Sequence, residues 1–273
     1  MKNSRKHTTN AKANALHVKK TLVTLGSMVK KNVKNQYRRS VLGILWTVLS
    51  PLLNMLVLAF VFSAIFGRKG IDLDYPVYIL SGNIVFGLLR MASNNSLSCI
   101  VDNYDLLTKT RINYNVFPLS QNLSSLVNFG FSLVALIIVM LIRIPAGVSF
   151  HWTMLMIVFP WLPSIFMFTL GVSFILATIY VRFRDIKHIY SIFLTLWTYM
   201  TPIFYSVNVL SPTVRKVLII NPMYHYLTYF RQLLLGVVPS FTAHLICYGV
   251  GIGALAIGAT IFNLARKKFI LYI

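Results

Sequence analysis

Residues 41–67 read VLGILWTVLSPLLNMLVLAFVFSAIFG, a run of 27 residues without a charged side chain. A helix needs about 20 apolar residues to cross the roughly 30 Å hydrocarbon core of a bilayer, so this run is long enough to span it. A secretory signal has a shorter apolar region followed by a cleavage site of small residues. Here the first 39 residues carry eleven Lys and Arg and no acidic residue, and we expect 41–67 to be a retained first span.

Further apolar runs of spanning length follow along the chain. They lie at about 76–100, 118–142, 152–181, 187–207 and 241–265. The connection at about 208–240 is semi-apolar and is broken by Pro212, Pro222 and Pro239. We expect short helices there that enter the outer face of the membrane and return, with their backbone satisfied against protein. The sequence therefore predicts an all-α membrane protein with six transmembrane helices and short re-entrant helices between spans five and six.

The composition of the whole chain agrees with this class. Of 273 residues, 57% are hydrophobic and 11% are charged, whereas soluble domains usually carry about 25% charged residues. The chain is too apolar for a disordered segment or a water-soluble enzyme. A nucleic-acid binder would carry its basic charge on a polar chain, so we expect no nucleic-acid partner.

The net charge of +21 also orients the chain. With six spans both termini share one side of the membrane. That side carries 19 of the 26 Lys and Arg residues and the other side carries 6, while Arg90 lies within a span. Basic residues concentrate on the cytoplasmic side of membrane proteins, so the count predicts that both termini are cytoplasmic.

Residues 1–40 are predicted to be a basic cytoplasmic N-terminus, followed by a single transmembrane domain at 41–273. On a helical wheel, apolar residues of the N-terminus share one face and five lysines share another. The apolar residues are Val18, Leu22, Leu25, Val29 and Val33. This pattern predicts an amphipathic helix that lies on the cytoplasmic leaflet, attracted by anionic membrane lipids. The lysines would also serve simply to hold the N-terminus inside.

The scarcity of acidic residues limits the transport mechanism. All five are aspartates in loops or at span ends, and the chain has no glutamate. Carriers driven by H⁺ or Na⁺ use carboxylates or histidines at membrane depth, so ion coupling is not expected. The chain also lacks the GxxxxGK[ST] phosphate-binding loop and any cluster of His and Cys ligands. We expect no metal, no cofactor and no catalytic residue on this chain, and energy must come from another subunit.

An enzymatic alternative depends on one motif. Asp102 and Asp105 form a DxxD, a spacing that could hold Mg²⁺ for a membrane-embedded lipid-phosphate transferase. Such enzymes need further acids nearby, and the sequence has no second cluster. The simpler interpretation is that these loop acids meet a partner or solvent.

Polar residues recur on one face of the second predicted span. Asn83, Gly87, Arg90 and Asn94 are spaced by four, three and four residues, which places them on one side of a helix. A charge that faces lipid there would cost at least about 2.5–3.5 kcal/mol, so the face should turn inward. It would line a conduit for a polar substrate, or it would make hydrogen bonds between helices.

Several motifs together resemble the permeases of type-2 ABC exporters, which move polysaccharides and polyol phosphates such as lipid-linked O-antigens, teichoic acids and capsule-like glycans. The resemblance covers roughly residues 20–268. Its motifs are Tyr37–Trp46 continuing to Pro51, Asp105–Lys109 followed by Val116-Phe117-Pro118, Arg184-Asp185, Thr201–Ser206, and Asn221-Pro222-Met223 with Tyr229-Phe230-Arg231.

The resemblance implies a permease subunit in a bacterial cytoplasmic membrane. Two copies of this chain would pair with two copies of a P-loop ATPase subunit, which would bind ATP and Mg²⁺, and would export a lipid-linked glycan. The residues that would contact the ATPase are Asp102, Asp105, Leu106, Lys109, Arg111, Arg184 and Asp185. An outer gate would involve Pro202, Tyr205, Asn221, Pro222 and Arg231.

Two arginines at the membrane surface are further candidates. Arg38 and Arg39 could hold the pyrophosphate of the lipid-linked substrate, because guanidinium groups bind phosphate oxygens well. They could equally serve only to anchor the positive side of the chain. Within the transporter class, a permease for a drug or a small lipid is the alternative to polysaccharide export.

Overall fold

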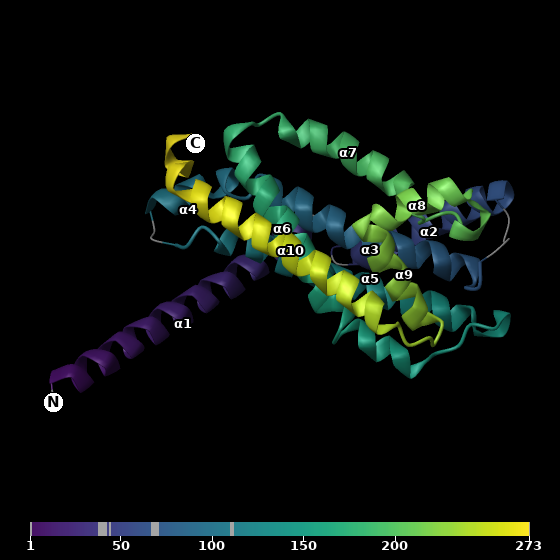
Figure 1. The fold of residues 1–273 in the computed structure, drawn as a ribbon, viewed down its shortest axis with the longest axis horizontal. Helices are drawn as coiled ribbons and strands as arrows, with labels where there is room; N and C mark the ends of the chain where they lie inside the picture. Colours follow the sequence, from purple (N-terminus) through teal and green to yellow (C-terminus); the bar gives the residue numbers. More distant parts are fainter. Residues whose placement is uncertain (1, 38–42, 44, 67–70, 110–111, 273) are drawn as a thin grey trace.

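The computed structural model describes residues 2–37, 43, 45–66, 71–109 and 112–272, and within them the regular elements are all helical (Figure 1). The α-helices are α1 (Lys2–Tyr37), α2 (Leu45–Phe66), α3 (Tyr75–Leu97), α4 (Tyr104–Lys109), α5 (Val116–Ile142), α6 (Trp161–Arg182), α7 (Ile186–Met200), α8 (Pro212–Ile220), α9 (Pro222–Leu234) and α10 (Phe241–Ala265). Short 3-10 turns are η1 (Val101–Asn103), η2 (Ile144–Ala146), η3 (Trp152–Ile157), η4 (Val207–Val209) and η5 (Arg266–Leu271). The predicted all-α class is confirmed at this level.

Four helical segments among the described residues are long and apolar enough to cross a membrane. They are Tyr75–Leu97, Val116–Ile142, Trp152–Arg182 and Phe241–Phe269. The third contains a break that was not predicted, since η3 ends at Ile157 and α6 begins only after Pro160. These segments match four of the six predicted spans.

The other two predicted spans have shorter counterparts. In α2, the described apolar stretch is Leu45–Leu58, which is shorter than a span. α7 has 15 residues, or about 22 Å at 1.5 Å per residue, which is less than the hydrocarbon core. Its end has a local cause: Thr201 is extended, as a residue before proline prefers to be, and Pro202 cannot continue the helix. The six-span topology therefore stays a prediction.

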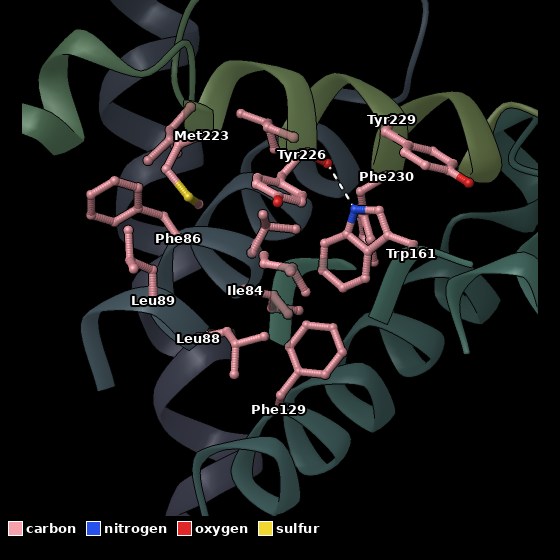
Figure 2. Packing of buried hydrophobic residues seen from close by; sticks show 14 of the residues in the cluster. Ile84, Phe86, Leu88, Leu89, Phe129, Trp161, Met223, Tyr226, Tyr229 and Phe230 are labelled. Carbon is pink, nitrogen blue, oxygen red and sulfur yellow. Dashed lines mark hydrogen bonds between the residues drawn. The ribbon is translucent and has the colours of Figure 1, made fainter. Parts of the chain in front are cut away.

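α3 lies at the centre of the bundle, between α2, α5, α6 and α9. Figure 2 shows α9 packed on this centre through large side chains. Trp161 of α6 donates its indole N–H to the Tyr226 carbonyl at 2.9 Å, and its ring centroid lies 4.9 Å from that of Phe230 and 5.5 Å from that of Phe129. The prolines of 208–240 thus produce two short helices, and the second is covered by protein.

α6 and α10 run side by side along most of their length (Figure 1). Gly171 of α6 touches the backbone of Ala254, and Gly258 touches the Gly171 carbonyl, so neither glycine has room for a Cβ atom. The small residues at 254 and 258 therefore allow α6 and α10 to pack closely. Gly249 and Gly253, which share the same spacing, have no neighbour within 4 Å.

The loops gather at two ends of the bundle. At one end an apolar cluster joins the end of α3, α4, the start of α5, the ends of α6 and α10, and η5. At the other end Arg143, which follows α5, forms an ion pair with Asp74 ahead of α3 at 2.6 Å. This hydrogen-bonded carboxylate raises the pKa of Arg143.

α1 packs on α5 by its C-terminal part. Met28 is buried at the first of these two ends, and Asn128 of α5 donates to the Gln36 side-chain oxygen at 3.0 Å. The lysines from Lys19 to Lys34 are exposed, whereas Val29 and Val33 are half-buried. Leu22 is 60% exposed because the N-terminal part of the helix projects from the bundle (Figure 1).

Candidate functional site

A polar cavity of about 750 Å³ lies between α2, α3, α5 and α7. Its lining includes Ser50 and Asn54 from α2, Asn128 and Ser132 from α5, Thr195, Thr198 and Tyr199 from α7, and Phe204 from the turn after α7. This volume is in the range of small-molecule sites, and its walls carry more polar groups than is usual for such sites.

The polar face of α3 forms one wall of this cavity. Asn83, Gly87, Arg90 and Asn94 all line it, as their spacing in the sequence predicts. The same face also makes contacts between helices, since Arg90 donates from Nη2 to Thr198 Oγ1 at 2.8 Å. Both alternatives for this face thus have geometric support, and its role in transport stays a prediction.

Several cavity residues could not be found from the sequence of α3 alone. Asn54 and Asn128 are asparagines inside apolar runs, which is the signal that could have drawn attention to them. Thr198 and Phe204 have no such signal, because only the packing of α7 and its following turn brings them to α3. Among the lining residues that the structure describes, Arg90 is the one with a charged side chain, and no lining residue is acidic.

A buried arginine holds the turn after α7 in place. Arg231 of α9 is 8% exposed. Its guanidinium donates to the carbonyls of Pro202 at 2.8 Å, Tyr78 at 3.0 Å and Ile203 at 3.1 Å. The carbon of the guanidinium lies 3.4 Å from the centre of the Tyr78 ring. The charge is therefore stabilised by carbonyl dipoles and an aromatic face.

The predicted gate residues converge on this arginine. Tyr78 donates its hydroxyl to the Tyr205 carbonyl at 2.6 Å, and the Tyr205 hydroxyl in turn donates to the Tyr199 carbonyl at 3.0 Å. Tyr78 was not predicted, since it lies on α3 well away from the polar face. We define the gate turn as residues 201–206.

Asn221 connects α9 to the end of α7. Its side-chain oxygen caps α9 by accepting from the Met223 N–H at 3.0 Å and also accepts from the Trp197 indole at 2.8 Å. Its amide donates to Thr201 Oγ1 at 3.0 Å. Pro222 occupies the first turn of α9, where a missing N–H costs nothing. The motif thus fixes the joint between gate turn and α9.

The gate turn closes one end of the polar cavity. Ile203 is fully buried and Phe204, its neighbour, lines the cavity. Gly82 of α3 allows this approach, because a Cβ atom there would lie 2.8 Å from Ile203 Cγ2 and 3.1 Å from Arg231 Nη2. Movement of the gate turn would therefore change the shape of the cavity.

The residues predicted to contact an ATPase lie at the opposite end of α3. Asp102 is in η1 and Asp105, Leu106 and Lys109 are in α4, where the aspartates and the lysine are exposed. Leu106 packs on the apolar cluster at that end. Arg184 and Asp185 are exposed in the turn between α6 and α7. Arg111, Arg38 and Arg39 lie outside the described residues.

The two aspartates of the DxxD motif lie in neighbouring helical elements, Asp102 in η1 and Asp105 in α4. Asp102 accepts a hydrogen bond from the Ser98 hydroxyl at 2.6 Å. Within the part of the chain that the structure describes, no group of three or more His, Cys, Asp or Glu side chains gathers at one place. The geometry therefore adds no further metal ligand to the two aspartates.

Comparison with known proteins extends over most of the chain. The family model for ABC-2 type transporters matches residues 24–235. The chain is 34% identical to an O-antigen export system permease protein of Myxococcus xanthus over 212 residues, which cover 76% of this chain and 78% of that protein. It is 26% identical to an O-antigen export permease of Klebsiella pneumoniae, covering 89% and 92%. It is also 25% identical to a polysialic acid transport protein of Escherichia coli, covering 86% and 87%.

Proposed function

The chain belongs to the family of ABC-2 type transporters, and from this premise we propose that it is the permease subunit of an ATP-driven polysaccharide exporter. The cargo is a lipid-linked cell-surface glycan or a teichoic-acid-like polymer, and the membrane is the bacterial cytoplasmic membrane. Relatives named for the export of O-antigen and polysialic acid support this class of cargo. The observation that carries the proposal is the polar cavity of α3, with the gate turn at one end.

The proposed topology has six spans with both termini in the cytoplasm. α2 and α7 complete the four long segments, and α8 and α9 are the re-entrant helices on the outer side. Two features support this arrangement. α9 is covered by α3, α5 and α6, as a helix that does not cross the membrane must be at this depth. The loops also gather at two ends of the bundle, and the charge count makes the end with α4 cytoplasmic.

The proposed mechanism couples the two ends of α3. An ATPase subunit docks on α4 and on the turn at Arg184 and Asp185. Its closure on ATP tilts α3 through the apolar cluster that contains Leu106, and α7 through the turn at Arg184 and Asp185. The gate turn then separates from Tyr78 and the cavity opens outward. Two copies of this chain face each other, so that the polymer passes between two such cavities.

The ATPase partner binds ATP and Mg²⁺, and this chain binds no cofactor of its own. Arg38 and Arg39, ahead of α2, meet the pyrophosphate of the lipid carrier at the cytoplasmic leaflet. Replacement of both by Gln should abolish export while membrane insertion and assembly with the ATPase persist. Loss of insertion instead would contradict this role.

Reconstitution tests the function. We expect the chain to co-purify with a P-loop ATPase encoded beside it, and the complex in nanodiscs to hydrolyse ATP in a vanadate-sensitive manner. Lipid-linked oligosaccharides should stimulate that hydrolysis. Stimulation by hydrophobic drugs and not by any glycolipid would favour a drug or small-lipid permease. Activity of the permease alone with Mg²⁺, lost in Asp102→Asn, would favour the transferase.

A further inference from the structure

The charge of the polar cavity identifies a property of its ligand. Polar side chains from α2, α3, α5 and α7 line it, and five of them are asparagines. These are Asn54, Asn83, Asn94, Asn95 and Asn128. An amide both donates and accepts, which suits the hydroxyl groups of sugars but does not distinguish neutral from charged ones.

Arg90 adds a positive charge to this neutral wall. It is exposed to the cavity, and the described lining residues include no carboxylate to neutralise it. One guanidinium N–H is taken by Thr198, and the Phe86 ring lies 5.5 Å from its carbon. The remaining N–H groups have no acceptor among the described residues. A guanidinium has five donors in a planar fork, so most of its binding capacity is directed to the cavity.

A charged side chain within a membrane-spanning helix is costly, so its presence points to a functional role. A guanidinium facing lipid costs at least about 2.5–3.5 kcal/mol, and a helix contact with Thr198 alone could be made by a neutral side chain. The geometry points to Arg90 as the specificity-determining residue for an anionic group, a phosphate or a carboxylate, on the exported glycan. This inference rests on the proposed function and narrows it to an anionic cargo.

The anion has two possible sources in such a cargo. It belongs either to the repeating unit of the polymer or to the pyrophosphate of the lipid carrier. The cavity chemistry is the same in both, since each offers oxygen acceptors to the arginine fork. Arg90 lies about 18 Å along α3 from Tyr78, whereas Phe204 of the gate turn lines the same cavity as Arg90.

Equilibrium binding to the full chain in nanodiscs of zwitterionic lipid tests the inference. The probes are a neutral glucose oligomer, a glycerol-phosphate oligomer of matched length, and a neutral disaccharide on a polyprenyl pyrophosphate. We expect the wild type to bind at least one phosphate-bearing probe about tenfold more tightly than the neutral oligomer. Arg90→Gln should remove this preference, while Arg90→Lys should retain part of it. The phosphate-bearing probe that loses affinity identifies the source.

Two further variants separate recognition from structure and from net charge. Thr198→Val removes the contact with α7 but keeps the cation, so it should retain the preference that Arg90→Gln loses. Lys216→Gln removes an exposed positive charge from α8 and should change nothing.

Three outcomes would overturn the inference. They are equal binding of neutral and anionic probes by the wild type, an undiminished preference in Arg90→Gln, and a loss in Thr198→Val equal to that in Arg90→Gln. In these cases the proposed function still stands, provided that glycans bind. If no carbohydrate probe binds the wild type or stimulates ATP hydrolysis of the complex, the proposed function fails and the inference fails with it.

Discussion

Arg90 and Arg231 are both arginines inside the helical bundle, and they differ in burial and in hydrogen bonding. Arg231 is 8% exposed and donates to three backbone carbonyls. Arg90 is exposed to a cavity and donates to one hydroxyl. A guanidinium that donates to several backbone carbonyls holds protein segments together, whereas one with most of its donors free can bind a ligand. The same residue type therefore serves as a clamp in one place and as a binding group in the other.

Loss of Arg231 should have the largest effect on stability. Arg231→Met removes the hydrogen bonds to the carbonyls of Pro202, Ile203 and Tyr78 in a buried site, and the Ile203 carbonyl then has no other side-chain donor among the described residues. We expect a loss of roughly 3 kcal/mol or more in the free energy of unfolding. Thermal unfolding of the purified chain in detergent measures it. Arg231→Lys should rescue little, because an ammonium group cannot reproduce the planar fork. An unchanged melting temperature would show that the hydrogen bonds of Arg231 do not stabilise the fold.

Gly82 tests whether the clamp requires a close backbone approach. Gly82→Ala places a methyl group against Ile203 and Arg231, and overpacking of this kind costs about 1–3 kcal/mol. Gly87→Ala is the matched control on the same helix, since a Cβ atom there has no neighbour within 4 Å. It should stabilise α3 by about 0.5–1 kcal/mol. Equal changes of melting temperature in both variants would contradict the tight contact at Ile203.

A third arginine extends the comparison to a half-buried ion pair. Arg143 meets Asp74 at 2.6 Å, with the arginine side chain 32% exposed and the carboxylate 11% exposed. Water and salt screen such a pair, so Asp74→Asn should cost no more than about 1 kcal/mol and less at high salt. Melting temperatures at low and high salt concentration measure this. A loss as large as that of Arg231→Met would mean that the pair behaves as a buried one.

Arg90 should have the smallest effect on stability of the three arginines. Arg90→Met removes one hydrogen bond to Thr198, whose hydroxyl still donates to the Leu194 carbonyl at 2.7 Å. We expect a change within about 1 kcal/mol. Unfolding in the absence of glycan measures it. A loss of several kcal/mol would make Arg90 a second clamp and would remove the basis of the comparison.

Much of the architecture could be predicted from local sequence. The run at 241–265 coincides with α10, and the prolines at 212 and 222 mark the first turns of α8 and α9. The spacing of polar residues within 76–100 correctly predicts that they share one face of α3. The break before α6 and the early end of α7 were missed, although Pro160 and Pro202 are visible in the sequence.

Only some of the residues that meet at Arg231 and the gate turn could be predicted from the sequence. Family motifs pointed to Arg231, Asn221 and Tyr205, but not to Tyr78 or Gly82. These two residues matter because a segment more than 120 positions away is packed against them. The spacing of residues along one helix carries no information about such a distant contact.

The sequence by itself determined the membrane class, the expected sidedness and the polar face of α3, because lipid requires long apolar runs and loops keep the charges. Only the tertiary structure decided which arginine is buried against backbone carbonyls. The acceptors of Arg231 lie 29, 28 and 153 positions away, at Pro202, Ile203 and Tyr78. Their carbonyls can compensate a buried charge only after α3, α9 and the gate turn have packed together. That packing provides Arg231 with three carbonyl acceptors and leaves Arg90 with a single hydroxyl acceptor.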